Sequence, residues 1–204
     1  MALIVIGGHS RNIGKTSVVA GLISALADFH WAAVKITQYG HGICSANGEA
    51  CDCATAGHTW AISEERDRSG GSDTSRFLAA GAEPVLWVRT EQGRLAEAMP
   101  ALRKKLESAR NVMIESNSVL KFLRPDLYLT ILDPATADFK SSAREFLDRA
   151  DAVILHDAGS EPSWQSVSLK PVANRPIFRI RTPNYVTDEL IAYIRASLTA
   201  STER

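Results

Sequence analysis

Near the start of the chain, the stretch "GGHSRNIGKTS" carries residue types that could bind phosphate groups. It ends in Gly14, Lys15 and Thr16. A glycine lets backbone N–H groups approach a phosphate, a lysine neutralises the charge of β- and γ-phosphates, and a threonine hydroxyl can hold Mg²⁺. The usual pattern, G-x-x-x-x-G-K-[ST], requires a glycine where this chain has His9, and the nearest glycine is Gly8. The stretch is therefore either a chance sequence or a phosphate loop that is one residue longer.

Two carboxylates and a second lysine could complete a site of this kind. Glu115 ends a predicted buried strand, and Asp73 lies at a predicted helix N-cap. Mg²⁺ prefers carboxylate, hydroxyl and phosphate oxygens, so both are candidate ligands; a simple helix cap and an arginine-paired carboxylate are the alternatives. Lys35 interrupts the apolar run "AAVKIT". Because lysine is rarely buried unless paired, we expect it at the carboxyl edge of its strand, where ligands of open α/β sheets bind, or solvated there.

All three cysteines fall in the segment "HGICSANGEACDCATAGH", which could hold a metal ion. Thiolates and imidazoles suit tetrahedral Zn²⁺, and three cysteines with one histidine form a common structural set. A loop this polar cannot fold on its own apolar contacts, so a metal would supply the missing stability. The spacing matches no established zinc motif, so an Fe–S cluster, reduced thiols and a disulfide formed on handling are the alternatives. The candidate ligands are Cys44, Cys51, Cys53 and a histidine, for which His58 is preferred to His41 because His41 lies close to Cys44.

The elements that must position these residues alternate along the chain. Near-continuous apolar runs predict strands buried on both faces, and apolar residues at helical spacing between them predict amphipathic helices. The predicted strands are 2–7, 32–37, 84–89, 111–115, 127–132, 152–156 and 177–181. Helices are predicted from residue 15 onward and within 95–106, 139–150 and 190–198, with Pro100 kinking or restarting the second. We therefore predict a doubly wound, mainly parallel α/β sheet of about seven strands with helices on both faces.

Length and composition favour one soluble unit. The 204 residues fit a single domain, 1–204, with a polar loop insertion at 38–72 that contains every cysteine. Lysine plus arginine equals aspartate plus glutamate, at 23 each, which gives no sign of nucleic-acid binding. No apolar run approaches the ~20 residues that span a bilayer, and the N-terminus is typical of a first strand and not of a signal peptide. We expect a cytoplasmic protein that binds no membrane.

Three stretches resemble known families of phosphate-loop NTPases over residues 1–160. The loop "GGHSRNIGKTS" resembles that of dethiobiotin synthetase, G-x-x-x-x-x-G-K-T, in the branch that also holds the MinD-type ATPases and the molybdopterin-guanine dinucleotide biosynthesis B proteins. "GGSDTSRFLAAGA" is similar to the G-x-D-[ST]-x-R-x-x-x-A-G-A stretch of the last family, and "NVMIESNS" lies where a strand ending in V-E-G is expected. MinD-type members carry a second lysine where this chain has Ser10, so a lysine-bridged dimer is not expected, and another kind of homodimer stays open.

The resemblance implies roles for particular residues. It implies phosphate binding by Gly8, Asn12, Ile13, Gly14, Lys15, Thr16 and Ser17. It implies Mg²⁺ ligands at Thr16, Asp73 and Glu115. It also implies that Lys35, with Glu115, takes part in substrate contact or catalysis, since dethiobiotin synthetase has a substrate-contacting lysine at the matching place.

The chain departs from these families where the substrate would be chosen. Ser116 replaces the glycine after the glutamate, Asn12 replaces an acidic residue of dethiobiotin synthetase, and the histidine-rich run of the molybdopterin family is absent. The N-K-x-D stretch of guanine-specific proteins is absent too, and His156, Asp157 and Asn184 do not identify the base.

Three functions follow from this resemblance. The leading interpretation is Mg²⁺-dependent binding and hydrolysis of ATP or GTP, as in the molybdopterin-guanine dinucleotide biosynthesis B family, in the service of cofactor assembly. The second is a ligase or kinase similar to dethiobiotin synthetase, in which phosphoryl transfer activates a small acid. The third is a nucleotide-gated metal carrier or adaptor that acts through its cysteine loop. The partner beyond the nucleotide, a small molecule or a protein, stays open.

Overall fold

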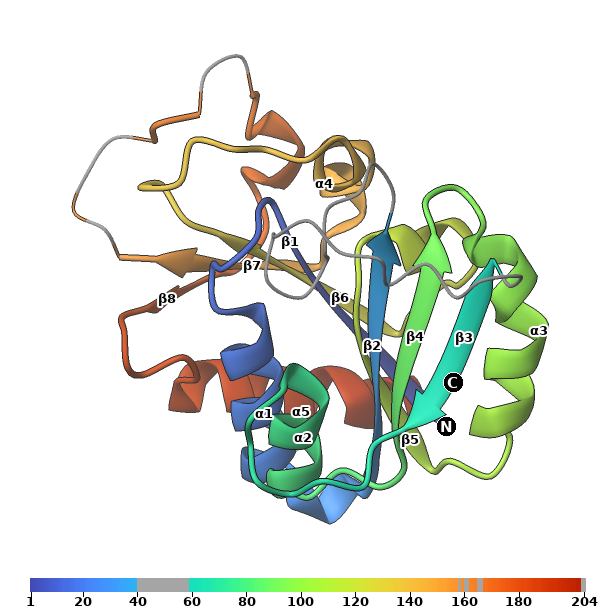
Figure 1. Cartoon of the computed structure of the whole chain (residues 1–204). Coiled ribbons are helices and arrows are strands. Elements are labelled where there is room, and N and C mark those ends of the chain that lie inside the picture. Colours follow the sequence, from blue (N-terminus) through green and yellow to red (C-terminus); the bar gives the residue numbers. More distant parts are fainter. Residues whose placement is uncertain (40–58, 158, 160–161, 165–166, 203–204) are drawn as a thin grey trace.

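The computed structural model describes residues 1–39, 59–157, 159, 162–164 and 167–202. Within that part of the chain, eight strands form one sheet in the order β3-β4-β2-β5-β1-β6-β7-β8 (Figure 1). The strands are β1 (Ala2–Gly8), β2 (Trp31–Tyr39), β3 (Trp60–Glu64), β4 (Val85–Glu91), β5 (Asn111–Glu115), β6 (Leu127–Leu132), β7 (Ala152–His156) and β8 (Ile177–Ile180). All neighbouring pairs are parallel except β3 and β4. The predicted fold class is confirmed, and each predicted strand is present.

Helices and short 3₁₀ turns connect these strands. They are α1 (Lys15–Ala25), η1 (Ala27–Phe29), α2 (Asp73–Ala79), α3 (Leu95–Leu106), η2 (Ser118–Lys121), α4 (Ser141–Glu145), η3 (Leu147–Arg149), η4 (Lys170–Val172) and α5 (Asp188–Thr202). The helix predicted over 139–150 is shorter, because α4 gives way to the turn η3. The α3 helix contains Pro100 without restarting, at the cost of one backbone hydrogen bond. In the described ranges, no helix is both long enough and apolar enough to cross a membrane.

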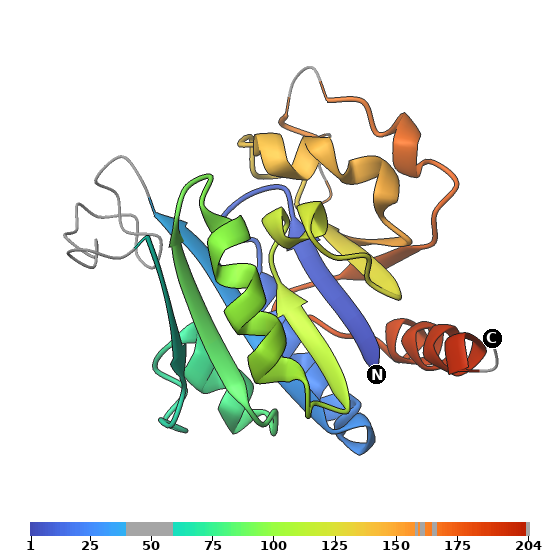
Figure 2. The same cartoon turned by 90° about the vertical axis from the view of Figure 1, so that its right-hand side faces the viewer.

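The helices cover both faces of the sheet and create two separate apolar cores. On one face, α3, η2 and α4 pack against the sheet, and on the other face α1, α2 and α5 do so (Figures 1 and 2). Successive strand residues serve opposite cores, since side chains alternate across a strand. In β1, Val5 belongs to the first core, whereas Ile4 and Ile6 belong to the second. This two-sided burial explains why the strands are near-continuous apolar runs.

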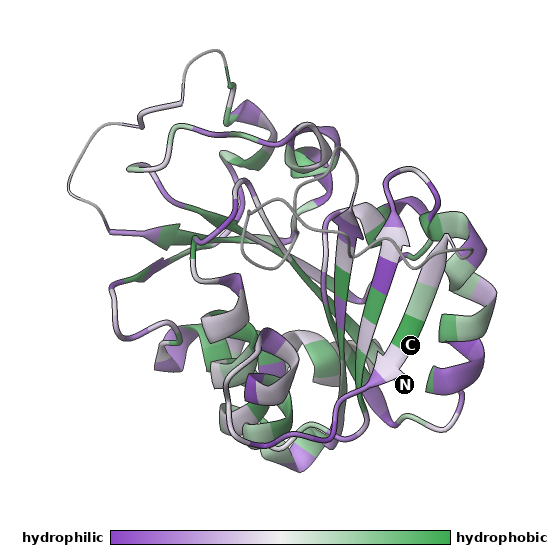
Figure 3. Ribbon diagram, in the orientation of Figure 1, coloured by the Kyte–Doolittle hydropathy of each residue, from purple (hydrophilic) through white to green (hydrophobic). Residues whose placement is uncertain are grey.

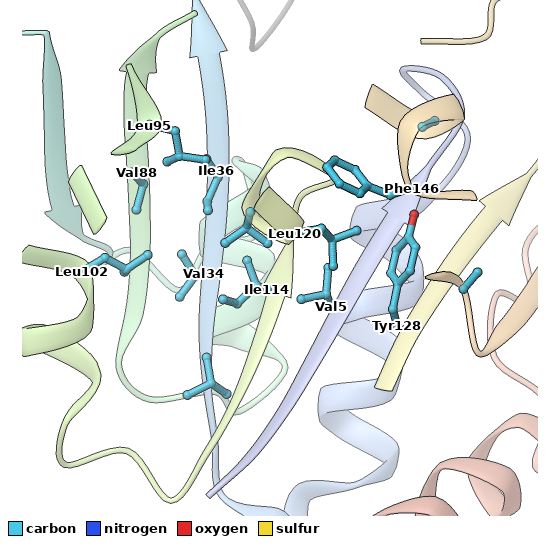
Figure 4. Packing of buried hydrophobic residues seen from close by; sticks show 14 of the residues in the cluster. Val5, Val34, Ile36, Val88, Leu95, Leu102, Ile114, Leu120, Tyr128 and Phe146 are labelled. Atoms are coloured by element: carbon cyan, nitrogen blue, oxygen red, sulfur yellow. The ribbon is translucent and has the colours of Figure 1, made fainter. Parts of the chain in front are cut away.

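The hydropathy of the chain follows this arrangement. The central strands are predominantly hydrophobic along their length (Figure 3). The close view of the first core shows Val34 and Ile36 of β2 beside Ile114 of β5 and Leu95 and Leu102 of α3 (Figure 4). The strands are therefore packed on both faces, which fixes the positions of the residues at the strand ends.

One strand arises where the sequence analysis predicted a loop. β3 lies inside the stretch 38–72 and pairs antiparallel with β4 at the edge of the sheet. Every residue of its sequence, WAISE, is at least partly exposed. A short edge strand of this kind lacks the apolar run that marks the buried strands, which is why the sequence pattern missed it.

Candidate functional site

The loop between β1 and α1 has a backbone suited to anions. Asn12 and Gly14 adopt left-handed φ angles of 55° and 79°, and α1 begins at Lys15 directly after them. Left-handed residues in a turn let successive N–H groups point to one side, and the first turn of a helix adds its positive dipole end. The predicted helix start at Lys15 is confirmed. The phosphate loop, residues 8–16, can therefore receive a phosphate group on its backbone.

The beginning of the phosphate loop is held by Asn117, which follows β5. The backbone N–H of Gly8 donates to the Asn117 Oδ1 atom at 2.9 Å, and the Asn117 Nδ2 atom donates to the Gly8 carbonyl at 2.9 Å. A Cβ atom on Gly7 would lie 2.1 Å from the same amide oxygen, so the close approach requires glycine there. Sequence reasoning missed Asn117, although it stands two residues after Glu115 at the end of a central strand.

Lys15 supplies the positive charge of the phosphate loop. Its ammonium donates to the backbone oxygen of Ser10, so the side chain lies back across the loop. Burial lowers the pKa of Lys15; attraction to Glu115 opposes this effect, and repulsion from Lys35 adds to it. A buried cation of this kind gains stability when an anion approaches, because the anion replaces the lost solvation.

A cluster of four side chains lies beside the phosphate loop: Glu115 ends β5, Lys35 lies in the middle of β2, and the other two lie in the first turns of α1 and α2. The register of β2 and β5 places Lys35 opposite Glu115. The Lys35 Nζ atom lies 2.5 Å from the Glu115 Oε1 atom and 2.8 Å from the Asp73 Oδ2 atom. The Thr16 hydroxyl donates to the Glu115 Oε2 atom at 2.9 Å. Thr16, Lys35, Asp73 and Glu115 are thus brought together from four separate elements.

The ion pairs with Glu115 and Asp73 explain how a lysine is accommodated in an apolar strand. Its side chain is 13% exposed, so it is not a solvated strand end. Burial disfavours its charged form, but the carboxylates of Glu115 and Asp73 outweigh burial and raise the pKa of Lys35. Burial likewise opposes ionisation of Asp73, yet the Lys35 ammonium and the Thr16 hydroxyl lower the pKa of that carboxyl group. Both charges of the pair are therefore kept at neutral pH.

The donor set of this cluster fits Mg²⁺. Two carboxylates and one hydroxyl are hard oxygen ligands, and the phosphate oxygens of a nucleotide and water would complete an octahedral set. Glu115 is 3% exposed and Asp73 is 47% exposed, so the cluster runs from the interior to the surface. The Lys35 ammonium lies between the two carboxylates, where it neutralises them. A metal ion that binds both carboxylates must therefore compete with this ammonium.

The start of α2 differs from the prediction in one respect. The N-cap is Ser72, whose hydroxyl accepts from the Ser75 N–H, and Asp73 is the first residue of the helix. Asp73 is therefore free of the capping role and can pair with Lys35. Arg76 of the same helix donates to the Ser17 Oγ atom at 3.0 Å, which joins α2 to α1. Arg76 was not predicted as a site residue, although it lies in the stretch quoted for the family resemblance.

On the other side of the phosphate loop, residues from β7 and the β8–α5 connection approach it. The His156 Nε2 atom lies 3.0 Å from the Ile13 carbonyl oxygen, to which it donates. The ring of Tyr185 lies against Gly14, where a Cβ atom would come 2.4 Å from the Tyr185 Cε1 atom. His156 and Tyr185 also contact each other edge to face, with ring centroids 6.0 Å apart. Gly14 is therefore required both for its φ angle and for this contact.

Asp157 and Asn184, which were considered with His156 for base recognition, lie near the same edge. Asp157 follows β7 and pairs with Arg181 through a 2.7 Å contact between its Oδ2 atom and the Arg181 Nη2 atom. Asn184 and Arg181 exchange backbone hydrogen bonds in the turn before α5. The arrangement offers polar groups beside the loop but does not select adenine or guanine.

The predicted second metal site falls outside the described residues. Its candidate ligands Cys44, Cys51, Cys53 and His58 all lie in 40–58. Across the described part of the chain, no group of three or more histidine, cysteine, aspartate or glutamate side chains could hold a metal ion. The cysteine site therefore stays a prediction from the sequence.

No protein-family model matches the chain, and no curated protein sequence matches it. Solved structures do match. HypB from Helicobacter pylori, crystallised in complex with nickel, has 15% sequence identity, with 99% of this chain and 87% of that one covered and a TM-score of 0.53. The hydrogenase maturation factor HypB from Archaeoglobus fulgidus has 12% identity, 97% and 90% coverage and a TM-score of 0.53.

A MobB protein homologue from Bacillus stearothermophilus has 16% identity, with 98% of this chain and 99% of that one covered and a TM-score of 0.46. Likeness at such low identity extends to the fold and no further. For the two HypB structures, the predicted doubly wound, mainly parallel α/β fold is confirmed at that level.

Proposed function

We propose that this chain, which has the fold of the phosphate-loop NTPases, binds ATP or GTP together with Mg²⁺ and hydrolyses it. The observation that supports this most strongly is the convergence of Lys15 and Thr16 with Glu115 at the carboxyl edge of the central strands. Ligands of open α/β sheets bind at this edge. The geometry thus brings together a backbone cradle, a buried cation and hard oxygen ligands, which are the parts that phosphoryl transfer needs.

Each residue has a separate task in this proposal. Lys15 binds the β- and γ-phosphates, and the loop backbone holds them in place. Thr16, Asp73 and Glu115 hold Mg²⁺, which when bound neutralises charge on the phosphates. The ammonium of Lys35 pairs with both carboxylates and would share them with the metal.

Calorimetric titration with ATP and GTP, with and without Mg²⁺, tests the proposal. Wild-type protein should bind one of the two triphosphates, and Mg²⁺ should strengthen binding. Lys15→Ala should abolish binding, because the phosphates lose the buried cation of the loop. An exposed lysine of α3, Lys104, provides the matched control, and Lys104→Ala should bind like the wild type. Wild-type protein that binds neither triphosphate with Mg²⁺ would refute the proposal.

Turnover separates hydrolysis from a ligase reaction. Phosphate release with nucleotide and Mg²⁺ alone is expected for a hydrolase, whereas a ligase similar to dethiobiotin synthetase would release phosphate only with a small acid present. Lys35 is paired with Glu115 and Asp73, which favours a role in the metal site over contact with a separate acceptor. Hydrolysis is therefore the function that the geometry supports best.

We also propose that the segment 40–58 binds one metal ion through Cys44, Cys51, Cys53 and His58 in the service of cofactor or metal-centre assembly. The supporting observation is its attachment: β2 ends at Tyr39 and β3 begins at Trp60, both at the sheet edge that carries the phosphate loop. Elemental analysis of freshly purified protein tests this proposal. About one equivalent of zinc or iron is expected, and its absence in protein with reduced thiols that still binds nucleotide would refute it.

A further inference from the structure

The extra residue of the phosphate loop anchors it to another segment. His9 stands where the shorter pattern has glycine, and its side chain is fully buried. Its backbone N–H donates to the Ile131 carbonyl at 3.1 Å. Its Nε2 atom accepts from the Asp133 N–H at 3.0 Å, and its Nδ1 atom lies 2.7 Å from the Asp138 carbonyl oxygen. His9 therefore ties the phosphate loop to the connection between β6 and α4, residues 133–140.

The hydrogen bonds fix one form of the imidazole ring. Because Nε2 accepts from a backbone N–H, the proton of a neutral ring lies on Nδ1 and is donated to the Asp138 carbonyl. Burial lowers the pKa of His9, which favours this neutral form. The ring packs against both Phe139 and Trp164, with centroid distances of 5.0 and 4.9 Å. The anchor is thus rigid and uncharged.

Two further hydrogen bonds join the phosphate loop to the β6–α4 connection, and the second involves Lys140. The Ser10 hydroxyl donates to the Asp138 Oδ2 atom at 2.7 Å. The Lys140 N–H donates to the His9 carbonyl at 2.8 Å. The phosphate loop and the β6–α4 connection consequently lie side by side, as both views show (Figures 1 and 2). The backbone of Lys140 is fixed directly against the loop.

The Lys140 side chain is acted on by three cations and by one anion, Asp138. In the described part of the chain, its ammonium has no hydrogen-bond or ion-pair partner, in contrast to Lys35. The pKa of Lys140 is lowered to about 8, mainly by burial and in addition by repulsion from Lys15, Arg11 and, more weakly, Lys35, against attraction to Asp138. An amine that is half-buried beside other cations is stabilised strongly by an anion that all of them can share.

We propose that Lys140 is a second phosphate-binding lysine of this site, which contacts the terminal phosphate of a nucleoside triphosphate, and that His9 positions it. This inference rests on the proposed function. The terminal phosphate is the favoured contact, because the Lys140 backbone is hydrogen-bonded to His9 at the start of the phosphate loop, and Lys15 of the same loop is among the cations that repel its ammonium. A terminal phosphate bears the highest charge density of the nucleotide and would neutralise this group of lysines.

Affinity for triphosphate and diphosphate measured on the same variants tests the proposal. With a non-hydrolysable ATP or GTP analogue, Lys140→Met should bind at least about tenfold more weakly than wild type, as expected for loss of a charge-assisted hydrogen bond. The diphosphate should bind with less than about threefold change, since it lacks the contacted group. Lys140→Arg should retain most of the affinity, and Lys104→Met on α3 should behave like wild type.

The pH dependence gives a second readout that a purely structural role would not move. As pH rises through about 8, the wild-type preference for triphosphate over diphosphate should fall, because the Lys140 ammonium loses its proton. In Lys140→Met, this fall in the preference for triphosphate near pH 8 should be absent. Any contribution from Lys15, Arg11, Lys35 and Asp138 is the same in both proteins and cancels in the comparison. Thermal unfolding of each variant shows whether it is folded.

The outcomes separate the two proposals. A folded Lys140→Met protein that binds triphosphate as tightly as wild type, or that weakens both nucleotides equally, would overturn the role of Lys140 while leaving nucleotide binding intact. Wild-type protein that binds neither nucleotide would overturn both. Selective loss of triphosphate affinity, restored in Lys140→Arg, is the result expected from the structure.

Discussion

Replacing Lys35 with methionine should show how much the Lys35 ammonium stabilises the two carboxylates of the cluster. The Lys35 ammonium pairs with Glu115 and Asp73 inside the site. Methionine keeps most of the length and volume of the side chain but removes its charge. The Glu115 carboxylate, which is 3% exposed, then loses its closest cation while remaining in the interior. The variant should fold less stably, and its stability should depend on a metal ion.

The structure sets the size of this effect. Removal of one partner from a buried ion pair costs about 3–5 kcal/mol, because the remaining charge is left uncompensated. The Thr16 hydroxyl still donates to Glu115 and Lys15 still attracts it, so the lower end, about 3 kcal/mol, applies. Asp73 is 47% exposed and adds less than about 1 kcal/mol. For a chain of this size, 3 kcal/mol lowers the melting temperature by roughly 6–12 °C.

Thermal unfolding followed by circular dichroism measures this change. Without divalent cations, in EDTA, Lys35→Met should melt well below the wild type. Excess Mg²⁺ should restore much of the difference in the variant, since the metal binds two unneutralised carboxylates, and should stabilise the wild type less. Lys104→Met, which removes an exposed lysine of α3, controls for the loss of one positive charge.

Two results would contradict this reasoning. If Lys35→Met is as stable as wild type in EDTA, the pair contributes nothing and Glu115 does not depend on it. If the variant is destabilised but Mg²⁺ has no larger effect on it than on wild type, the carboxylates do not form a Mg²⁺ site. The second result would also remove Thr16, Asp73 and Glu115 as metal ligands in the proposed function.

Three further predictions address the loop and the cysteine segment. Gly14→Ala should abolish triphosphate binding in calorimetry, because the left-handed backbone and the 2.4 Å approach to Tyr185 exclude a Cβ atom; unchanged affinity would refute this. His9→Ala should lower the free energy of unfolding by roughly 2 kcal/mol or more, since it leaves a cavity and an unpaired Asp133 N–H. Burial holds the pKa of His9 below 6.5, so the unfolded chain takes up a proton before the folded protein does as pH falls. The contribution of His9 to the free energy of unfolding is therefore present above pH 6.5 and declines below it. This decline is expected in the wild type but not in His9→Ala. Replacing the three cysteines with serine should remove the bound metal in elemental analysis and lower the melting temperature, and an unchanged melting temperature would count against a structural metal. These three positions are Cys44, Cys51 and Cys53.

The sequence predicted those parts of the fold and site that have a local signal. The buried strands are apolar runs, so their existence and the parallel sheet could be inferred. The start of α1 at Lys15 follows from the glycine, lysine and threonine at 14–16. Ser72 rather than Asp73 caps α2, because either residue type can cap and only the backbone decides between them.

Long-range pairing could not be predicted from one sequence. The register that places Lys35 opposite Glu115 depends on which strands are neighbours, and no local pattern encodes it. The partners of His9 lie more than a hundred residues away, at Asp133 and Asp138, and one of the contacts is to a backbone oxygen. Lys140 has no motif at all, and its role becomes visible only when the two connections lie side by side.

The anchoring of the longer loop has a consequence for how relatives of this chain can diverge. A deletion that restores the shorter loop would remove the His9 imidazole, which is the partner of the Asp133 N–H, and would shift the backbone carbonyl that accepts from the Lys140 N–H. The phosphate loop and the β6–α4 connection therefore depend on each other. Among relatives of this chain, the length of the loop at position 9 should covary with the length and composition of the segment 133–140. A lineage that lost one without the other would carry unpaired backbone groups beside its phosphate site, and selection would remove it.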